Sequence, residues 1–372
     1  MRRGRTFLFL LLAAGIALAT FAAAHRVFLG RLLTFPRDTP ILSVDWYEPK
    51  EPVPGAFSAP LPSATPSEAG IAPAALERAA RWAEEQRSAA LLVMRDGRVV
   101  FERAFAGHDL ERPTTSYSMA KTLLGLLVGV ALREGALASL DEPVATFVPE
   151  WTDGARRRIR IDDLLRMQSG LEEDGDREDP FSPMIRTHLS EDAAAPALAR
   201  AAVEPPGRRF EYRNLDSQLL ALCLERATGE RYAELLSTRL WRPLGARDAA
   251  IWLDRDGGSA KAYCCVFARA RDWARVGEMM RLGGAFEGRR IVDADWIERM
   301  LEPSPFEPRY GRHVWRHEGD EVVPPFFYLD GGRKQRVWVV RSHRLVVVRV
   351  GERAPDWDEL AIVRTIVEGI DA

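Results

Sequence analysis

Apolar runs typical of β-strands lie near both ends of this chain, while its middle third has the residue spacing of helices. Residues 89–94 and 99–101 flank Asp96-Gly97, a dipeptide that favours a tight hairpin turn. Residues 335–341 and 345–350 form a second pair of such runs. Because strands must pair to satisfy their backbone groups, strands at both ends with helices between them predict one antiparallel sheet built from distant segments.

The remaining periodicity is helical. Residues 72–87 and 356–370 predict amphipathic helices, and residues 118–137 predict a long, largely buried one. We therefore expect an α+β fold, with an antiparallel sheet flanked by helices and an inserted all-helical subdomain over about 118–255. At this length the chain can form one large domain or two intimately joined subdomains. The helix that begins at residue 118 would lie at the seam between sheet and insert, where clefts tend to form.

Ser118 and Lys121 stand at the start of that buried helix. Arginines supply almost all of the basic charge, and the lysines are Lys50, Lys121, Lys261 and Lys334. Arginine stays protonated, whereas a desolvated lysine can lose its proton near neutral pH. An i, i+3 spacing places hydroxyl and amine on one helix face, as a nucleophile beside a base. The alternative is a helix-capping serine followed by a solvated lysine.

Two further motifs could complete such a site. Tyr212 and Asn214 precede a helical pattern; a phenol near an ammonium can shuttle a proton, and the amide could orient the lysine or bind a carbonyl. The alternative is a buried tyrosine and a capping asparagine. Gly331 and Gly332 lead through Arg333 and Lys334 into a strand, and glycines there permit the close backbone approach that an oxyanion hole requires. The alternative is an ordinary glycine turn.

The N-terminus predicts a targeting or anchoring segment over residues 1–24. Arg2, Arg3 and Arg5 precede an uncharged apolar stretch over residues 6–24, which ends in three alanines. The sequence favours neither a cleaved signal peptide nor a retained membrane anchor, but both imply export to the periplasmic or extracellular side. Residues 25–65 are rich in proline and predict an extended lead-in that wraps the domain or spaces it from a membrane.

Composition excludes some classes of partner and site. The formal net charge of −2 provides no basic surface for nucleic acid. Cys223, Cys264 and Cys265 are too few for a disulfide framework, and buried thiols are the favoured interpretation because a bridge between adjacent cysteines is strained. His313 and His317 have a spacing that could place two metal ligands on one helix face, but no third ligand is evident, so two surface histidines are favoured.

An ordered series of motifs resembles the serine β-lactamase and penicillin-binding-protein superfamily over roughly residues 66–372. The matching segments are residues 116–123, 134–137, 140–144, 147–150, 159–171, 212–214, 227–229, 243–245 and 270–275. The Tyr-Arg-Asn form at residue 212 resembles the class C-related branch, which includes esterases and 6-aminohexanoate-oligomer hydrolases. The Lys-Thr-Gly triplet of penicillin-recognising members is missing here; residues 331–335 read Gly-Gly-Arg-Lys-Gln in its place.

The resemblance implies a hydrolase that cleaves a small ester or amide through an acyl-enzyme, without metal or organic cofactor. Ser118 would be the nucleophile, with Lys121 and Tyr212 in an acid–base relay and Asn214 orienting the amine. The backbone N–H of Ser118 and one from Gly332, Arg333 or Lys334 would bind the oxyanion. A β-lactamase or D-alanyl-D-alanine carboxypeptidase, and a non-catalytic envelope binding protein, are the alternatives. Neither substrate identity nor oligomeric state follows from the sequence.

Overall fold

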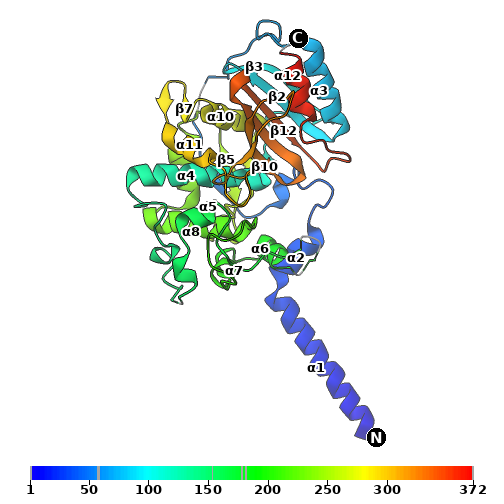
Figure 1. Ribbon diagram of the computed structural model, residues 1–372. Coiled ribbons are helices and arrows are strands. Elements are labelled where there is room, and N and C mark those ends of the chain that lie inside the picture. Colours follow the sequence, from blue (N-terminus) through cyan, green and yellow to red (C-terminus); the bar gives the residue numbers. More distant parts are fainter. Residues whose placement is uncertain (1, 57–58, 153, 177–178, 181, 371–372) are drawn as a thin grey trace.

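The computed structural model describes residues 2–56, 59–152, 154–176, 179–180 and 182–370, with side chains from residue 10 onward. The other residues, which fall within the predicted leader, lead-in, insert and hydrolase domain, lie outside this description. Segments far apart in the sequence, residues 88–104 and 315–351, meet in one six-stranded antiparallel sheet (Figure 1). Its strand order is β3-β2-β12-β11-β10-β9. The strands are β2 (Ser88–Arg95), β3 (Arg98–Ala104), β9 (Trp315–His317), β10 (Phe326–Gly331), β11 (Gln335–Val340) and β12 (Leu345–Gly351).

Helices cover both faces of this sheet. On one face, helices α3 (Pro73–Glu85) and α12 (Ala361–Glu368) pack over Leu91 and Val93. On the other, Leu92 and Met94 join a larger core with α10 (Ala270–Arg281). Alternate residues of a strand point to opposite faces, so a strand buried on both sides has a continuous apolar run, as β2 has over residues 89–94. The predicted α+β fold, with an antiparallel sheet flanked by helices, is confirmed.

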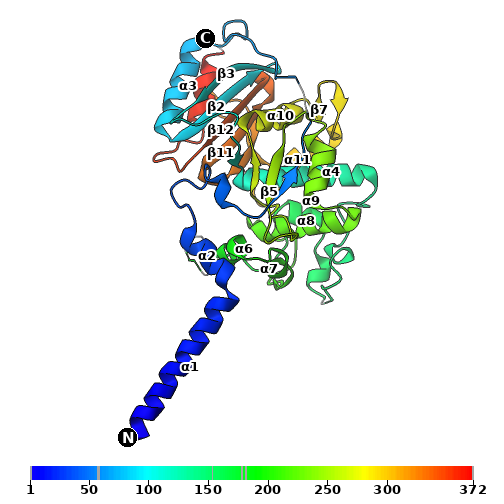
Figure 2. The same ribbon diagram turned by 180° about the vertical axis from the view of Figure 1, so that it is seen from behind.

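The helical part of the molecule lies below the sheet in Figure 1 and is seen from behind in Figure 2. Helix α4 crosses its core and is buried over its first twelve residues. It ends where Gly135 takes a left-handed conformation (φ 75°), which glycine adopts without steric cost. The helices here are α4 (Ala120–Glu134), α5 (Ile161–Leu165), α6 (Pro183–Leu189), α7 (Ala194–Leu198), α8 (Asn214–Thr228), α9 (Tyr232–Leu236) and α11 (Ala294–Leu301).

A second, smaller sheet joins the sheet domain to the helices, and the sequence did not predict it. Its order is β1-β5-β6-β4, from β1 (Lys50–Val53), β4 (Thr114–Thr115), β5 (Ala249–Trp252) and β6 (Val266–Ala268). A separate hairpin pairs β7 (Ala285–Phe286) with β8 (Arg289–Arg290). Strands of two to four residues are too short to show an alternating pattern, and distant segments supply their partners.

The N-terminal lead-in is part of the packed structure rather than extended throughout. Residues 26–34 form helix α2 (Arg26–Thr34), which contacts α6. Arg31 donates hydrogen bonds to the carbonyl oxygens of Ser190 and Asp254, at 2.8 and 2.9 Å. The prolines that predicted an extended segment begin only at Pro36, so they leave α2 free to form.

Helix α1 (Arg2–Ala24) extends away from the rest of the molecule (Figures 1 and 2). Its side chains from Leu10 to Ala24 are exposed, including Ile16 at 60% and Leu18 at 69%. Within the described part of the chain, no single helix is both long and apolar enough to cross a membrane. The pair formed by residues 10–24 and α2 meets those criteria together, with a bend of 76° between them.

Candidate active site

Ser118 and Lys121 face each other at the start of helix α4. The chain leaves β4 and makes a short 3-10 turn, η2 (Tyr117–Met119), before the helix begins. Tyr117 has a positive φ of 44°, an uncommon conformation for a non-glycine residue, and the next residue, Ser118, lines a cavity. The Nζ atom of Lys121 lies 3.1 Å from the Oγ atom of Ser118. The lysine is 2% exposed, so water does not solvate its amine freely.

Two neutral oxygens bind the other side of the Lys121 amine. Nζ donates to Oδ1 of Asn214 at 2.7 Å and to the carbonyl oxygen of Tyr263 at 3.0 Å. An uncharged amine has two N–H donors and one lone pair, whereas an ammonium has three donors and none. With both N–H groups directed to Asn214 and Tyr263, an uncharged amine would present its lone pair to the Ser118 hydroxyl, as a general base must.

Tyr212 and Asn214 reach the site from the segment that leads into helix α8. The ring centroid of Tyr212 lies 4.9 Å from the Lys121 amine, and the ring also contacts Trp315. Asn214 is fixed by its backbone N–H, which donates to a carboxylate oxygen of Asp174 at 2.5 Å. Burial raises the pKa of Asp174. The structure thus brings Ser118, Lys121, Tyr212 and Asn214 together, while their catalytic roles stay predictions.

The end of β10 passes close to the nucleophile. A Cβ atom on Gly331 would stand 2.4 Å from the carbonyl oxygen of Ser116, so only glycine lets the strand approach this near. Gly332 and Arg333 follow and line the same cavity as Ser118. The side chain of Lys334 instead pairs with Glu359. Of the three residues predicted to supply the second oxyanion donor, Gly332 follows the close approach directly.

Buried side chains bind the turn that follows Gly332 by hydrogen bonds. Arg333 and Lys334 both have positive φ, at 60° and 67°. Nη1 of Arg349 donates to their two carbonyl oxygens, at 2.8 and 3.2 Å, and the arginine is fully buried. Nε2 of Gln335 donates to the carbonyl oxygen of Gly351 at 2.5 Å. The loop conformation is therefore fixed by hydrogen bonds from neighbouring strands.

A cavity of about 580 Å³ opens over Ser118. Its lining is mainly aromatic and aliphatic, with few charged groups. Besides Ser118, Tyr212 and Asn214, it consists of Phe35, Tyr117, Met184, Ile185, His188, Tyr263, Cys264, Trp315, Asp330, Gly332 and Arg333. Asp330 is paired with Arg336, which reduces its negative charge in the cavity. The site therefore suits a small ligand with an apolar part next to the serine.

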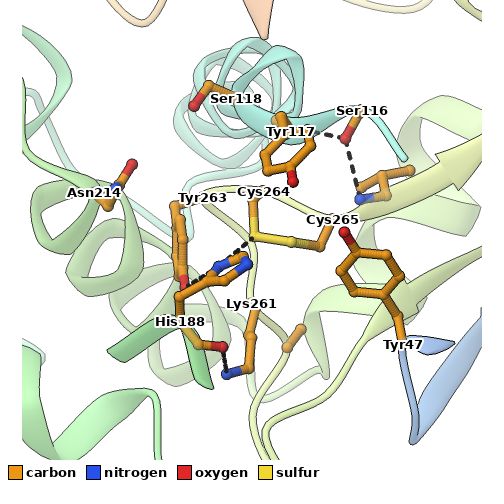
Figure 3. The surroundings of a disulfide bond; sticks show 12 residues. Tyr47, Ser116, Tyr117, Ser118, His188, Asn214, Lys261, Tyr263, Cys264 and Cys265 are labelled. Carbon is orange, nitrogen blue, oxygen red and sulfur yellow. Dashed lines mark hydrogen bonds between the residues drawn. A yellow bond between two sulfur atoms is a disulfide. The ribbon is translucent and has the colours of Figure 1, made fainter. Parts of the chain in front are cut away.

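Several of these residues had no signal in the sequence. Phe35 comes from the N-terminal lead-in, and Tyr263 contributes through a backbone carbonyl, which any residue has. His188 lies below the disulfide in Figure 3, with Nδ1 3.4 Å from the Tyr263 hydroxyl. Burial, with Lys261 and Arg31 nearby, lowers the pKa of His188 to about 3, so its imidazole is neutral at ordinary pH.

Two interpretations of individual residues were wrong. Cys264 and Cys265 form a disulfide rather than two buried thiols, because the turn between Tyr263 and β6 brings their side chains together; Cys223 is a buried free thiol, as predicted. His313 is not at the surface but 2% exposed, with Nε2 2.9 Å from Ser217 Oγ and Nδ1 2.8 Å from the Leu165 carbonyl oxygen. Because His317 lies on β9, the two histidines share no helix face.

A serine and a lysine lie one turn apart at the start of a buried helix, next to the end of β10 in the antiparallel sheet, as the resemblance implied. The chain belongs to the beta-lactamase family, whose model matches residues 74–367. Among curated proteins it is similar to the 6-aminohexanoate-dimer hydrolase of Paenarthrobacter ureafaciens, with 34% identity over 234 residues. That match covers 59% of this chain and 58% of the relative, a little over half of the relative's length.

Solved structures share the fold. A protein from Bacillus anthracis, provisionally named a 6-aminohexanoate-dimer hydrolase, superimposes with a TM-score of 0.74 at 19% identity, over 89% of this chain and 91% of that one. A family VIII carboxylesterase has a TM-score of 0.64 at 17% identity, over 81% of this chain and 98% of that one. At these identities the likeness concerns the architecture.

Proposed function

We propose that this protein hydrolyses a small ester or amide with an apolar acyl group, through an acyl-enzyme on Ser118. The observation that carries the proposal is the 3.1 Å distance between Lys121 Nζ and Ser118 Oγ inside a cavity with a mainly apolar lining. By name, one relative hydrolyses a dimer of 6-aminohexanoate and one solved structure is a carboxylesterase, which supports this substrate class.

The positions of these groups support the following reaction. Ser118 Oγ attacks the carbonyl carbon while its proton passes to Lys121, and the resulting oxyanion binds the backbone N–H groups of Ser118 and Gly332. Lys121 or Tyr212 then returns the proton to the departing alcohol or amine. Water attacks the acyl ester by the reverse of the same path, and Ser118 regains its proton.

Covalent labelling tests the proposal. A fluorophosphonate should modify Ser118 of the wild-type protein, as read by intact mass and peptide mapping, and should leave the Ser118→Ala variant unmodified. Rates on a chain-length series of p-nitrophenyl esters and on anilides should fall by at least about 10³-fold in that variant. Equal rates for wild type and variant would favour a non-catalytic binding protein instead.

Acylation by a fluorescent penicillin tests the β-lactamase alternative. Penicillin-recognising relatives bind the substrate carboxylate through a Lys-Thr-Gly triplet, which is missing from residues 331–335 of this chain. We therefore expect no acylation by a fluorescent penicillin at concentrations at which the ester substrates saturate. Stoichiometric penicillin labelling of Ser118 would make the protein a penicillin-recognising enzyme.

We also propose that the protein acts outside the cytoplasmic membrane. The exposed apolar side chains of α1 and the Cys264–Cys265 disulfide support this proposal, because disulfides persist in oxidising compartments. Fractionation of expressing cells, with N-terminal sequencing of the recovered protein, tests both export and cleavage after residue 24. Recovery of the full chain in the cytosolic fraction would contradict it.

A further inference from the structure

The Cys264–Cys265 disulfide, of which Cys264 lines the cavity, is shown in Figure 3, and the residues on either side of it in the sequence bind the segment around Ser118. On one side, the Tyr263 carbonyl oxygen accepts from Lys121 Nζ at 3.0 Å. On the other, Val266 accepts the backbone N–H of Ser116 at 2.9 Å and donates its own N–H to Ser116 Oγ at 3.1 Å. The two cysteines therefore connect Tyr263, which binds Lys121, directly to Val266, which binds Ser116.

The backbone of this link has a conformation that needs support. Cys265 has a φ of 68°, in the left-handed region that few non-glycine residues adopt. The Cys264 N–H donates to the Lys261 carbonyl oxygen, and the Cys265 carbonyl oxygen accepts from the Trp252 N–H, both at 3.1 Å. Because the two cysteine side chains are joined, the backbone of this turn has few other conformations available. The Tyr263 carbonyl therefore keeps its direction.

That direction decides what Lys121 presents to Ser118. Asn214 and Tyr263 accept hydrogen bonds from the amine, which leaves the lone pair of an uncharged amine for the serine hydroxyl. If the Tyr263 carbonyl turned away, one N–H would lose its acceptor and could rotate toward Ser118 Oγ. An amine that donates to Ser118 cannot at the same time take its proton.

We propose that the Cys264–Cys265 disulfide is a positioning element for Lys121, which holds the Tyr263 carbonyl where it orients the amine as a general base. This inference rests on the proposed function. Opening the disulfide slows acylation of Ser118 without removing any group that touches the substrate carbonyl or the transferred proton.

Reduction by a water-soluble tertiary phosphine tests the proposal on the full-length enzyme. The phosphine gives two electrons to the S–S bond and becomes a phosphine oxide with an oxygen from water, and both sulfurs become thiols with the protons of that water. EDTA is present throughout, because the two cysteine sulfurs and a ring nitrogen of His188, which lie within 4.8 Å of one another, could bind a metal ion once the disulfide is opened. Intact mass confirms the gain of two hydrogen atoms.

We expect kcat on a p-nitrophenyl ester to fall about 10- to 100-fold on reduction, with less change in KM, because a misplacement of about 1 Å can cost up to about 100-fold in rate. The acid limb of the kcat profile should move to lower pH, because the amine loses a carbonyl that favours its ammonium form. Oxidised glutathione, which re-forms the disulfide and is itself reduced to two thiols, should restore kcat. The double variant Cys264→Ala, Cys265→Ala should have the kcat of the reduced enzyme, and the phosphine should not change it.

The Cys223→Ala variant is the matched control, because this buried free thiol lies in α8 and does not line the pocket. It should respond to the phosphine as the wild type does. A verified dithiol enzyme with unchanged kcat and pH profile would overturn the positioning role and leave the proposed function intact. Failure of the oxidised wild type to take a fluorophosphonate would instead refute the proposed function itself.

Discussion

The amine of Lys121 lies closer to Asn214 than to the serine it is proposed to activate. Its Nζ atom is 2.7 Å from Asn214 Oδ1 and 3.1 Å from Ser118 Oγ. A carboxamide is neutral at every working pH, so it binds an N–H of the lysine without adding a negative charge beside it. An aspartate in the same place would accept the same hydrogen bond but would favour the ammonium form.

The first prediction concerns that difference. Asn214→Asp should shift the acid limb of the kcat/KM profile to higher pH, because an adjacent carboxylate stabilises the charged amine and a higher pH is then needed to free its lone pair. Asn214→Ala should lower kcat without an upward shift, since it removes an acceptor and adds no charge. The measurement is ester hydrolysis from pH 5 to 10 for both variants. Identical profiles for Asn214→Asp and wild type would contradict Lys121 as the base.

The second prediction separates the charge of Lys121 from its ability to accept a proton. Lys121→Arg keeps a cation but cannot deprotonate at working pH, so kcat should fall by about 10²- to 10⁴-fold while the near-ultraviolet circular dichroism stays native. Lys121→Ala should be equally slow. Added methylamine should restore part of its rate, in proportion to the concentration of uncharged methylamine. Lys50→Arg, outside the pocket, serves as the control and should change kcat by less than about twofold. A fully active Lys121→Arg enzyme would exclude the proposed relay.

Local chemistry explains which elements were predictable. The hairpin between β2 and β3 was predicted from Asp96 and Gly97, and both residues have the positive φ that such a turn requires. The last helix was predicted over residues 356–370 and observed over Ala361–Glu368. Within the loop that precedes it, the Leu360 N–H donates to the Asp358 side chain instead of continuing a helix backward.

The candidate site divides in the same way. Ser118 and Lys121 are three residues apart, so helix geometry alone predicts their contact. Tyr263 binds the lysine through its main chain, and Phe35 reaches the pocket from the lead-in; neither has a periodicity or a composition that marks it. Tertiary packing brings such residues to the site, so no short stretch of the sequence identifies them.

The third prediction concerns Arg349, which is fully buried and donates through Nη1 to the carbonyl oxygens of Arg333 and Lys334. Arg349→Lys keeps a long basic side chain but loses the planar fork that binds several carbonyls at once. We expect a lower melting temperature and a kcat reduced by roughly tenfold, because a looser loop misplaces the oxyanion donor at Gly332. Arg364→Lys, in a partly exposed ion pair on α12, is the control and should change neither quantity measurably. A lower melting temperature with an unchanged kcat would mean that Arg349 stabilises the fold but does not position the backbone N–H of Gly332.

The fourth prediction follows from the buried ring of His313. Its Nδ1–H donates to the Leu165 carbonyl oxygen, its Nε2 accepts from Ser217, and burial lowers its pKa to about 3. In the unfolded chain this histidine takes a proton below about pH 6.5 and in the native state it does not, so stability present at pH 7.5 is lost as pH falls. The unfolding free energy, measured by urea titration, should therefore fall between pH 7.5 and pH 5.5 by about 1.4 kcal/mol less in His313→Gln than in the wild type. Ser217→Ala removes one hydrogen bond but keeps the imidazole, so it should be less stable at every pH with the wild-type slope. Equal slopes for His313→Gln and wild type would mean that this ring takes a proton in the folded protein as readily as in the unfolded chain.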